Sequence, residues 1–124
     1  MILPCLYFAP AASMGRGVFT AENILTGTLV EISPVIIISG EERQLPDKTK
    51  LHDYIFEWGE KKSECCMAIG YVPLYNHSYA SNCEYEMPAR LSRSGGDFEN
   101  ERINIRAVRD IKAGEELFIN YNGD

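Results

Sequence analysis

The sequence predicts a mainly β fold from three observations. Short stretches rich in β-branched and aromatic residues recur along the chain, and turns that contain glycine or proline separate them. Helix signals are few by comparison. Residues 102–107 alternate between polar and apolar side chains, which predicts a half-buried strand with Ile103 and Ile105 facing the core. Because the chain has 124 residues, we expect one domain over residues 1–124, built as a compact open barrel or as layers of small sheets.

The other elements follow from local pattern. Residues 35–38 are all β-branched and apolar, so we expect a strand that is buried on both faces. The remaining expectations, in chain order, are a first strand at 6–8, a surface loop with at most one helical turn at 40–53, an aromatic strand at 54–58, a charged turn at 59–64, a short buried strand at 65–69 and a mobile hairpin loop at 92–97.

An internal repeat links two segments that lie far apart in the sequence. Residues 24–32 and 111–119 share isoleucine, glycine, an apolar residue and isoleucine at the same offsets. Each copy predicts a glycine turn that feeds a strand. The shared pattern fits an old duplication, and it fits equally well the common demands of a turn-to-strand unit.

Charge and composition narrow the class of partner. Eighteen acidic residues against twelve basic ones give a net charge of −6, which argues against direct nucleic-acid binding and suits a lysine-rich peptide, or serves solubility alone. No run approaches the roughly 18 apolar residues of a membrane span, and the start of the chain lacks a secretory signal. We therefore expect no membrane partner and an intracellular location, either cytoplasmic or nuclear.

The four cysteines do not predict a metal site. Cys65 and Cys66 are adjacent, so they cannot offer the usual spacing of two to four residues between ligands, and no histidine completes a set with Cys5 or Cys83. We expect reduced thiols and no bound metal.

The most unusual stretch of the chain is 70–86. Between Tyr71 and Tyr85 it holds four tyrosines, two asparagines, one histidine and two serines. These are too many hydrogen-bonding side chains for an ordinary core strand and too many rings for an ordinary solvated loop. The composition indicates a binding site.

Several motifs in this order resemble the SET-domain family of protein-lysine methyltransferases. Asn76-His77-Ser78 is followed by Asn82, and later by Gly114-Glu115-Glu116-Leu117 and Tyr121. The resemblance covers the chain from Gly15 to Tyr121. It implies the β-clip arrangement of several small sheets, in which the C-terminal segment passes under a loop to form a pseudoknot. It also implies transfer of methyl groups from S-adenosylmethionine to a lysine of a basic protein substrate, with histones among the candidates.

The resemblance assigns the cofactor to two segments. Met14, Gly15, Arg16 and Gly17 are similar to the part that meets the methionine end of S-adenosylmethionine, although a lone Gly-x-Gly fits a tight turn equally well. Asn76 and His77 are similar to the contacts with its amino and adenine groups, largely through the main chain. The His77 ring is also expected to hold the pseudoknot crossing.

Tyr121 is the expected catalytic residue, because family members place a tyrosine hydroxyl beside the transferring methyl, where it also contacts the cofactor. The alternative is a tyrosine that packs at the end of a strand. A hydrolase pair of His77 and Ser78 is disfavoured, since neighbours on a turn rarely face one another and no nucleophile elbow surrounds Ser78.

The resemblance also implies an aromatic channel for the target lysine. Tyr54 and Phe56 lie on the aromatic strand, together with Trp58 on the same face, and these rings could equally be core. Tyr85 is placed at the channel floor, or else faces outward. On the strand after Gly27, where some members have a further active-site tyrosine, this chain has Glu31-Ile32-Ser33, so one wall of the channel departs from the family pattern.

Two rival functions stay open from the sequence. One is a non-catalytic SET-like module that binds a basic peptide or protein partner, and the other is a β-clip module of another lineage that binds a small ligand. Many family members also carry zinc-binding cysteine clusters that close the site, whereas this sequence ends three residues after Tyr121. By similarity to small viral members that work as dimers, we expect a homodimer.

Overall fold

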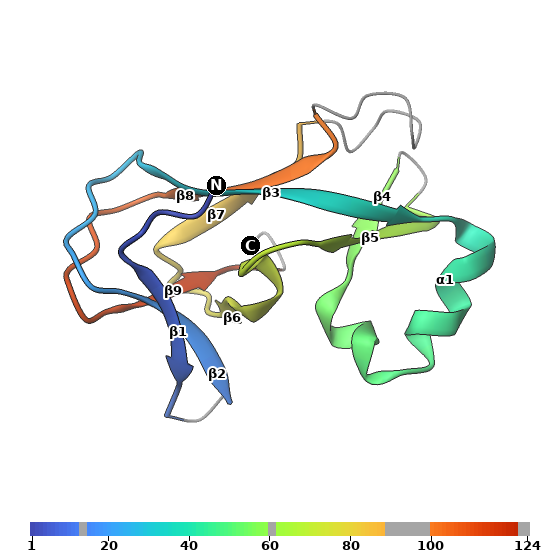
Figure 1. The fold of residues 1–124 in the computed structure, drawn as a ribbon, viewed down its shortest axis with the longest axis horizontal. Coiled ribbons are helices and arrows are strands. Elements are labelled where there is room, and N and C mark those ends of the chain that lie inside the picture. Colours follow the sequence, from blue (N-terminus) through green and yellow to red (C-terminus); the bar gives the residue numbers. More distant parts are fainter. Residues whose placement is uncertain (13–14, 60–61, 89–99, 122–124) are drawn as a thin grey trace.

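A computed structural model describes residues 1–12, 15–59, 62–88 and 100–121. Strands dominate this part of the chain, which confirms the mainly β prediction (Figure 1). The strands are β1 Leu6–Pro10, β2 Arg16–Thr20, β3 Leu29–Ile38, β4 Phe56–Trp58, β5 Glu64–Ala68, β6 Asn76–His77, β7 Cys83–Glu86, β8 Arg102–Ala107 and β9 Glu116–Ile119. The helical elements are α1 Gly40–Asp47 and the short 3-10 turns η1 Lys50–Tyr54 and η2 Val72–Leu74. The hairpin loop expected at 92–97 lies outside the described residues.

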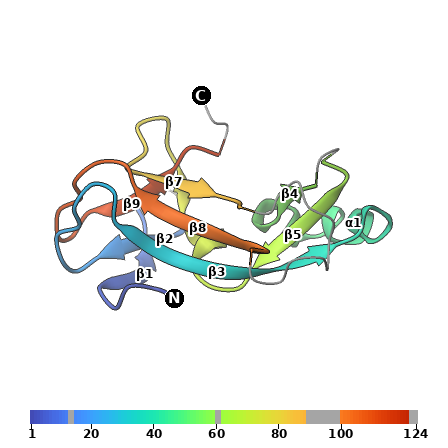
Figure 2. The ribbon, with the colours of Figure 1, turned by 90° about the horizontal axis from the view of Figure 1, so that it is seen from above.

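The described strands pair in one continuous path. Their order is β1-β2-β9-β7-β8-β3-β5-β4, and β6 pairs with β9 off this path. The first half of β3 pairs with β8 and the second half pairs with β5. Figures 1 and 2 show β3 running along the molecule, with α1 near one end and the β1–β2 hairpin toward the other.

Both predicted glycine turns are present, and each leads into a strand. Gly27 and Gly114 adopt φ values of 87° and 90°, a region that favours glycine because it has no Cβ. The strand after Gly27 is β3, and the strand after Gly114 is β9.

The two copies of the repeat also hold each other by matching hydrogen bonds. Ile24 and Ile111 exchange two backbone bonds of 2.8 Å. Two further bonds of the first copy each have an equivalent in the second. Gly27 N donates to Ala107 O at 2.8 Å, and the equivalent Gly114 N donates to Thr20 O at 2.7 Å. Thr26 N donates to Asp110 Oδ1 at 2.8 Å, and the equivalent Ala113 N donates to Asn23 Oδ1 at 2.9 Å. The common pattern in the sequence therefore encodes one reciprocal contact in the structure.

The prediction for residues 35–38 was right about the strand and wrong about its burial. This segment is the second half of β3, but Ile36 is 57% exposed. Its cross-strand partner Met67 is only partly buried. Because successive side chains of a strand point to opposite faces, Ile36 points to solvent. The β-branched composition of the segment predicted a strand but did not predict which side chains are buried.

The surface loop expected at 40–53 is instead the eight-residue helix α1 followed by η1. The missed signal is Ser39-Gly40-Glu41-Glu42. The Ser39 hydroxyl accepts a bond of 3.2 Å from Glu42 N, and two acidic residues lie in the first turn. A serine N-cap with a glutamate three residues later is a helix start. The polar composition suggested a loop because no residue of α1 is buried, so the helix lacks the apolar face that usually identifies one.

The aromatic strand is shorter than expected. Tyr54 ends η1, so placing it on a strand was wrong, whereas Phe56 and Trp58 begin and end β4. Trp58 is fully buried, and Phe56 is partly buried against the core. Phe56 and Trp58 therefore share a strand, while Tyr54 arrives from a turn.

The core is one cluster to which most strands contribute. Ile103 and Ile105 of β8 are fully buried, which confirms their inward orientation. In β5, Cys65 and Cys66 are fully buried as expected, but Ile69 lies after the strand and is 52% exposed.

At the end of the chain, β9 pairs with β2, β7 and β6. The Asn82 side chain adds a further link. Its Nδ2 donates to Glu116 O, its Oδ1 accepts from Phe118 N, both at 2.8 Å, and the residue is 2% exposed. The Asn82 amide thus bonds one backbone N–H and one backbone C=O of β9, as the backbone of a neighbouring strand would. The threading of a pseudoknot around β9 stays a prediction.

Replacing Asn82 by alanine should destabilise the fold by about 2–4 kcal/mol, because it leaves Glu116 O and Phe118 N buried without partners. The matched control is Asn23→Ala. Asn23 is exposed and gives up one bond to Ala113 N, so we expect a loss of about 1 kcal/mol. Urea unfolding of the three proteins would measure both values. Equal losses for the two variants would contradict the role given to Asn82.

Candidate active site

Tyr121 lies two residues after the end of β9, and both its main chain and its side chain form hydrogen bonds. Its hydroxyl donates to Tyr75 O at 2.7 Å and lies 3.4 Å from Val72 O. Its backbone N donates to His77 Nδ1 at 3.1 Å. The ring is thereby held against the segment formed by η2 and β6.

Burial raises the pKa of the Tyr121 hydroxyl above its ordinary value, and the nearby Tyr85 and Glu31 side chains raise it further. The hydroxyl therefore stays protonated at neutral pH. Because it keeps its proton, it keeps donating to the carbonyl of Tyr75.

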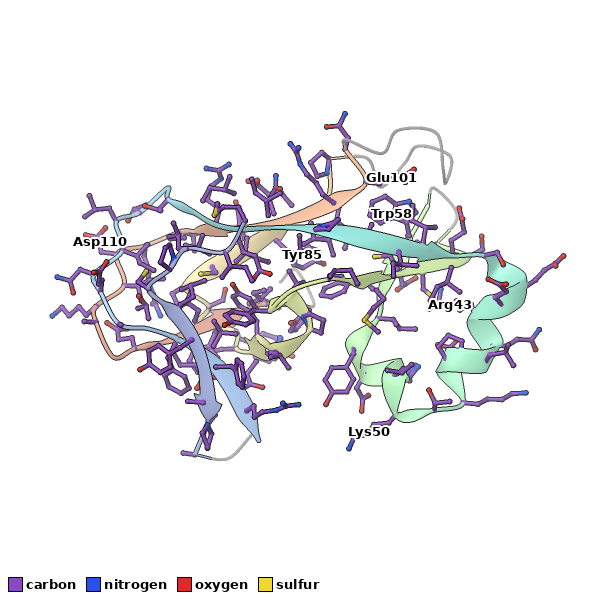
Figure 3. All side chains as sticks on the ribbon, in the orientation of Figure 1. Arg43, Lys50, Trp58, Tyr85, Glu101 and Asp110 are labelled. Atoms are coloured by element: carbon purple, nitrogen blue, oxygen red, sulfur yellow. The ribbon has the colours of Figure 1, made fainter. Side chains whose placement is uncertain are left out.

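Tyr121 belongs to a cluster of rings with Phe56 and Tyr85. The ring centroids of Phe56 and Tyr121 are 5.5 Å apart, those of Phe56 and Tyr85 are 5.7 Å apart, and Tyr85 stacks on Tyr121 at 6.3 Å. The alternative of an outward-facing Tyr85 is therefore wrong. Figure 3 shows Tyr85 near the middle of the molecule.

Two hollows adjoin this cluster. The first hollow, of about 410 Å³, is lined by Asp53, Tyr54, Ile55, Phe56, Pro73, Tyr75, Asn76, His77 and Tyr121. The second hollow, of about 420 Å³, is lined by Tyr79, Ser81, Cys83, Glu84, Tyr85, Val108 and Asn120. The stacked pair of Tyr121 and Tyr85 thus contributes one ring to each hollow. Both volumes fall within the range of small-molecule sites.

The two segments that the sequence assigned to the cofactor lie side by side. Asn76 Nδ2 donates to Arg16 O at 3.0 Å and to Glu116 Oε2 at 2.8 Å. A Cβ on Gly17 would overlap the Glu116 carboxylate and crowd Asn76 Nδ2, so a larger residue here would displace the contact between these two side chains. Gly15 adopts a φ of 69° with no atom within 4 Å of a built Cβ. Met14 lies outside the described residues.

His77 has one ring nitrogen engaged and one free of protein partners. Since Nδ1 accepts from the Tyr121 main chain, the proton of a neutral ring lies on Nε2. Nε2 is buried and has no hydrogen-bond partner among the described residues. Ser78 instead accepts from Ala80 N at 3.1 Å, which is not the arrangement of a hydrolase pair.

Two acidic residues of the site were missed as functional candidates. Glu116 fixes Asn76, and it was visible only as part of the Gly-Glu-Glu-Leu motif. Glu31 is fully buried, and its carboxylate accepts from the Tyr75 hydroxyl. The available signal for Glu31 was a carboxylate between Val30 and Ile32 in an otherwise apolar run.

Within the described residues, no three histidine, cysteine, aspartate or glutamate side chains lie close enough together to hold a metal ion. All four cysteines are free. None of the described helices has the length and apolarity needed to cross a membrane.

Comparison with known proteins agrees with this geometry. Two Schizosaccharomyces pombe proteins are similar: a histone-lysine N-methyltransferase specific for H3 lysine 37, 36% identical over 86% of this chain, and the histone-lysine N-methyltransferase set9, 31% identical over 81%. The aligned regions span 66% and 18% of those proteins.

A solved structure of a candidate histone methyltransferase from Plasmodium falciparum superposes with a TM-score of 0.73 at 28% identity, covering 99% of this chain and 97% of that one. The family model of the SET domain matches residues 15–122. The family predicted from the motifs around Asn76 and Tyr121 is confirmed, and the chain belongs to the SET-domain family.

Proposed function

We propose that this chain is a protein-lysine N-methyltransferase that uses S-adenosylmethionine to methylate a lysine of a basic protein. The observation that carries the proposal is the buried Tyr121 hydroxyl, fixed on a main-chain carbonyl inside an aromatic cluster with a hollow at each of two stacked rings. The names of the two fission-yeast relatives make a histone lysine the first substrate to test.

The first hollow suits the cofactor. Asn76 and His77 line it, and Arg16 and Gly17 lie against Asn76. Nε2 of His77 is a buried donor that has no acceptor among the described residues, as expected of a group that awaits a bound molecule. Met14, Gly15 and Arg16 complete the proposed cofactor set. When bound, S-adenosylmethionine supplies a methyl group activated by its sulfonium.

The second hollow gives the target lysine its approach. An in-line displacement needs the amine and the leaving sulfur on opposite sides of the methyl carbon, and a hollow at each of the two stacked rings would provide two such sides. Tyr85 lines this hollow, and its ring, packed against Phe56 of the first hollow, can accept the alkyl stem of lysine and exclude water. Tyr54 is at the edge of the first hollow, so its proposed channel role is at the cofactor end.

Tyr121 positions the reacting groups. Its proton is committed to Tyr75 O, so its oxygen lone pairs are available as acceptors for the amine. A lysine amine has an ordinary pKa of about 10.4, and transfer to a dry aromatic site disfavours its charged form. Holding a neutral amine in a near-attack pose can contribute several kcal/mol to the rate.

Action on a histone would place the protein in the nucleus. Self-association as a homodimer stays a prediction that rests on similarity to small dimeric members.

The rival function, a SET-like module that only binds a basic peptide, differs in one observable: it would bind peptide and transfer no methyl group. Incubation with labelled cofactor and a lysine-peptide library, read by mass spectrometry, separates the two.

Isothermal titration calorimetry should show one S-adenosylmethionine site per chain. Asn76→Ala should weaken binding by about 10-fold, because the loss of one hydrogen-bonded amide releases Arg16 and Glu116. Asn23→Ala, at the distant repeat contact, is the control and should bind normally. Binding that survives Asn76→Ala unchanged would remove the first hollow as the cofactor site.

Tyr121→Phe should lower turnover by about 10²-fold or more while the protein stays folded. The ring contacts with Phe56 and Tyr85 survive the change, and only the hydroxyl and its bonds are lost. Steady-state methylation of a histone peptide measures the effect, with Tyr7→Phe at a 40% exposed position as the control. Full activity of folded Tyr121→Phe would move the catalytic centre elsewhere.

Tyr85→Phe should raise the share of more highly methylated product, and the natural protein should stop mainly at one or two methyl groups. The Tyr85 hydroxyl occupies volume beside Tyr121 and can hold a water or the amine, so a methylated lysine has less room to turn its lone pair. Mass spectra after exhaustive reaction compare the two proteins. Identical product distributions would show that Tyr85 does not limit the channel.

A further inference from the structure

We propose that Glu31 is a positioning residue of this site, whose buried carboxylate fixes the segment that carries the acceptors of the Tyr121 hydroxyl. The segment consists of residues 71–75 and is called the acceptor segment below. The inference rests on the proposed function for its catalytic consequence and on the geometry alone for its structural part.

The Glu31 carboxylate is satisfied by three hydrogen-bond donors. Oε1 accepts from the Tyr75 hydroxyl at 2.8 Å, and Oε2 accepts from Tyr71 N at 2.8 Å and from the Ser33 hydroxyl. Glu31 is fully buried, and it forms no ion pair with the described residues. A buried carboxylate without a cation is strongly unfavourable unless such donors compensate it, so the contacts are mutually required.

Two of these donors come from the ends of the acceptor segment. Tyr71 begins it, Tyr75 ends it, and η2 lies between them. The internal bonds of the segment are few: Leu74 N donates to Tyr71 O at 2.7 Å, and the bond from Tyr75 N to Val72 O is long at 3.5 Å. One side chain from β3 therefore fixes both ends of a segment with little regular structure of its own.

The acceptor segment is also what holds Tyr121. The hydroxyl of Tyr121 donates to Tyr75 O at 2.7 Å, with Val72 O at 3.4 Å. Tyr75 thus bonds Glu31 through its side chain and Tyr121 through its carbonyl. A shift of Tyr75 would move the acceptor of the Tyr121 proton directly.

Gly70 provides a separate observation for the same contact. It adopts a φ of 149°, and a Cβ built there would overlap both the Glu31 carboxylate and the Ser33 hydroxyl. Space next to the acceptor segment is thus reserved for the carboxylate. Burial raises the pKa of the Tyr75 hydroxyl well above its ordinary value, and the charge of Glu31 and the bond to it raise it further, so Tyr75 remains a donor at neutral pH.

Glu31→Gln is the sharpest single change, because the amide keeps the shape of the side chain. The amide oxygen of glutamine can still accept a hydrogen bond, but its amino group is a donor. This amino group would face at least one of the three donors that bond the Glu31 carboxylate. At least one anchor of the acceptor segment is then lost. Tyr75→Phe removes one anchor from the other side, keeps its ring, and serves as the second variant if Glu31→Gln does not fold.

The test is a double-mutant cycle on kcat for methylation of a histone peptide. Glu31→Gln should lower kcat by about 10-fold in the natural protein and by less than about twofold in the Tyr121→Phe background, since it acts through the hydroxyl that is missing there. Tyr75→Phe should behave in the same way. The control variant Asn23→Ala, at the repeat contact with Ala113, should change both backgrounds by the same small factor. A Glu31→Gln effect of equal size in both backgrounds would overturn the proposal.

A second measurement separates this proposal from the proposed function. Tyrosines labelled with ¹³C at Cζ give one NMR signal each, and Tyr121→Phe identifies that of Tyr121. Glu31→Gln and Tyr75→Phe, the second of which keeps the Glu31 carboxylate, should both shift the Tyr121 signal, whereas Asn23→Ala should leave it in place. An unshifted signal overturns the positioning role whether or not the protein transfers methyl groups. A shifted signal in a protein without methyl transfer would uphold the positioning of Tyr121 and overturn only the proposed reaction.

Discussion

The site depends on the placement of β9. This four-residue strand pairs with β2, β7 and β6, and Tyr121 follows it after one residue. A short strand can be held this firmly because many backbone groups meet it from several sides. Any displacement of β9 would move the Tyr121 ring relative to both hollows, so the precision of the site comes from the pairing around it.

Polar side chains complete this pairing where strands do not reach. Asn82 bonds two main-chain groups of β9, and Asn76 joins the Arg16 carbonyl to the Glu116 carboxylate. Glu31 does the same for the acceptor segment. Asn82 and Glu31 are costly to bury alone and stabilising once paired, so each fixes a segment in one position.

The chemistry proposed for the chain asks mainly for positioning, and the described geometry matches that demand. The Tyr121 hydroxyl is immobilised by its own hydrogen bond, the neighbouring rings offer an apolar path, and His77 lines a hollow that small molecules can fill. None of these features needs a titrating group near neutral pH. The remaining task, loss of the lysine proton, is favoured by removing the amine from water.

Local patterns in the sequence determined several of the strands, the two glycine turns and the family, but not β2, β6 or β7. Alternation along 102–107 placed Ile103 and Ile105 inside, and Gly27 and Gly114 marked turns, because these signals depend on neighbours in the chain. The order of the motifs around Asn76 and Tyr121 was enough to identify the SET domain. The start of α1 was also encoded locally, in the Ser39 cap, although its polar composition hid it.

Only the tertiary structure decided which groups meet. Whether Tyr85 faces inward depends on its register against β8 and on the rings of Phe56 and Tyr121, which come from distant segments. The partners of Glu31 lie 40 and 44 residues further along the chain, at Tyr71 and Tyr75. A carboxylate in an apolar run signals that something must satisfy it, but the sequence cannot say what, since hydrogen bonds are chosen by position in space.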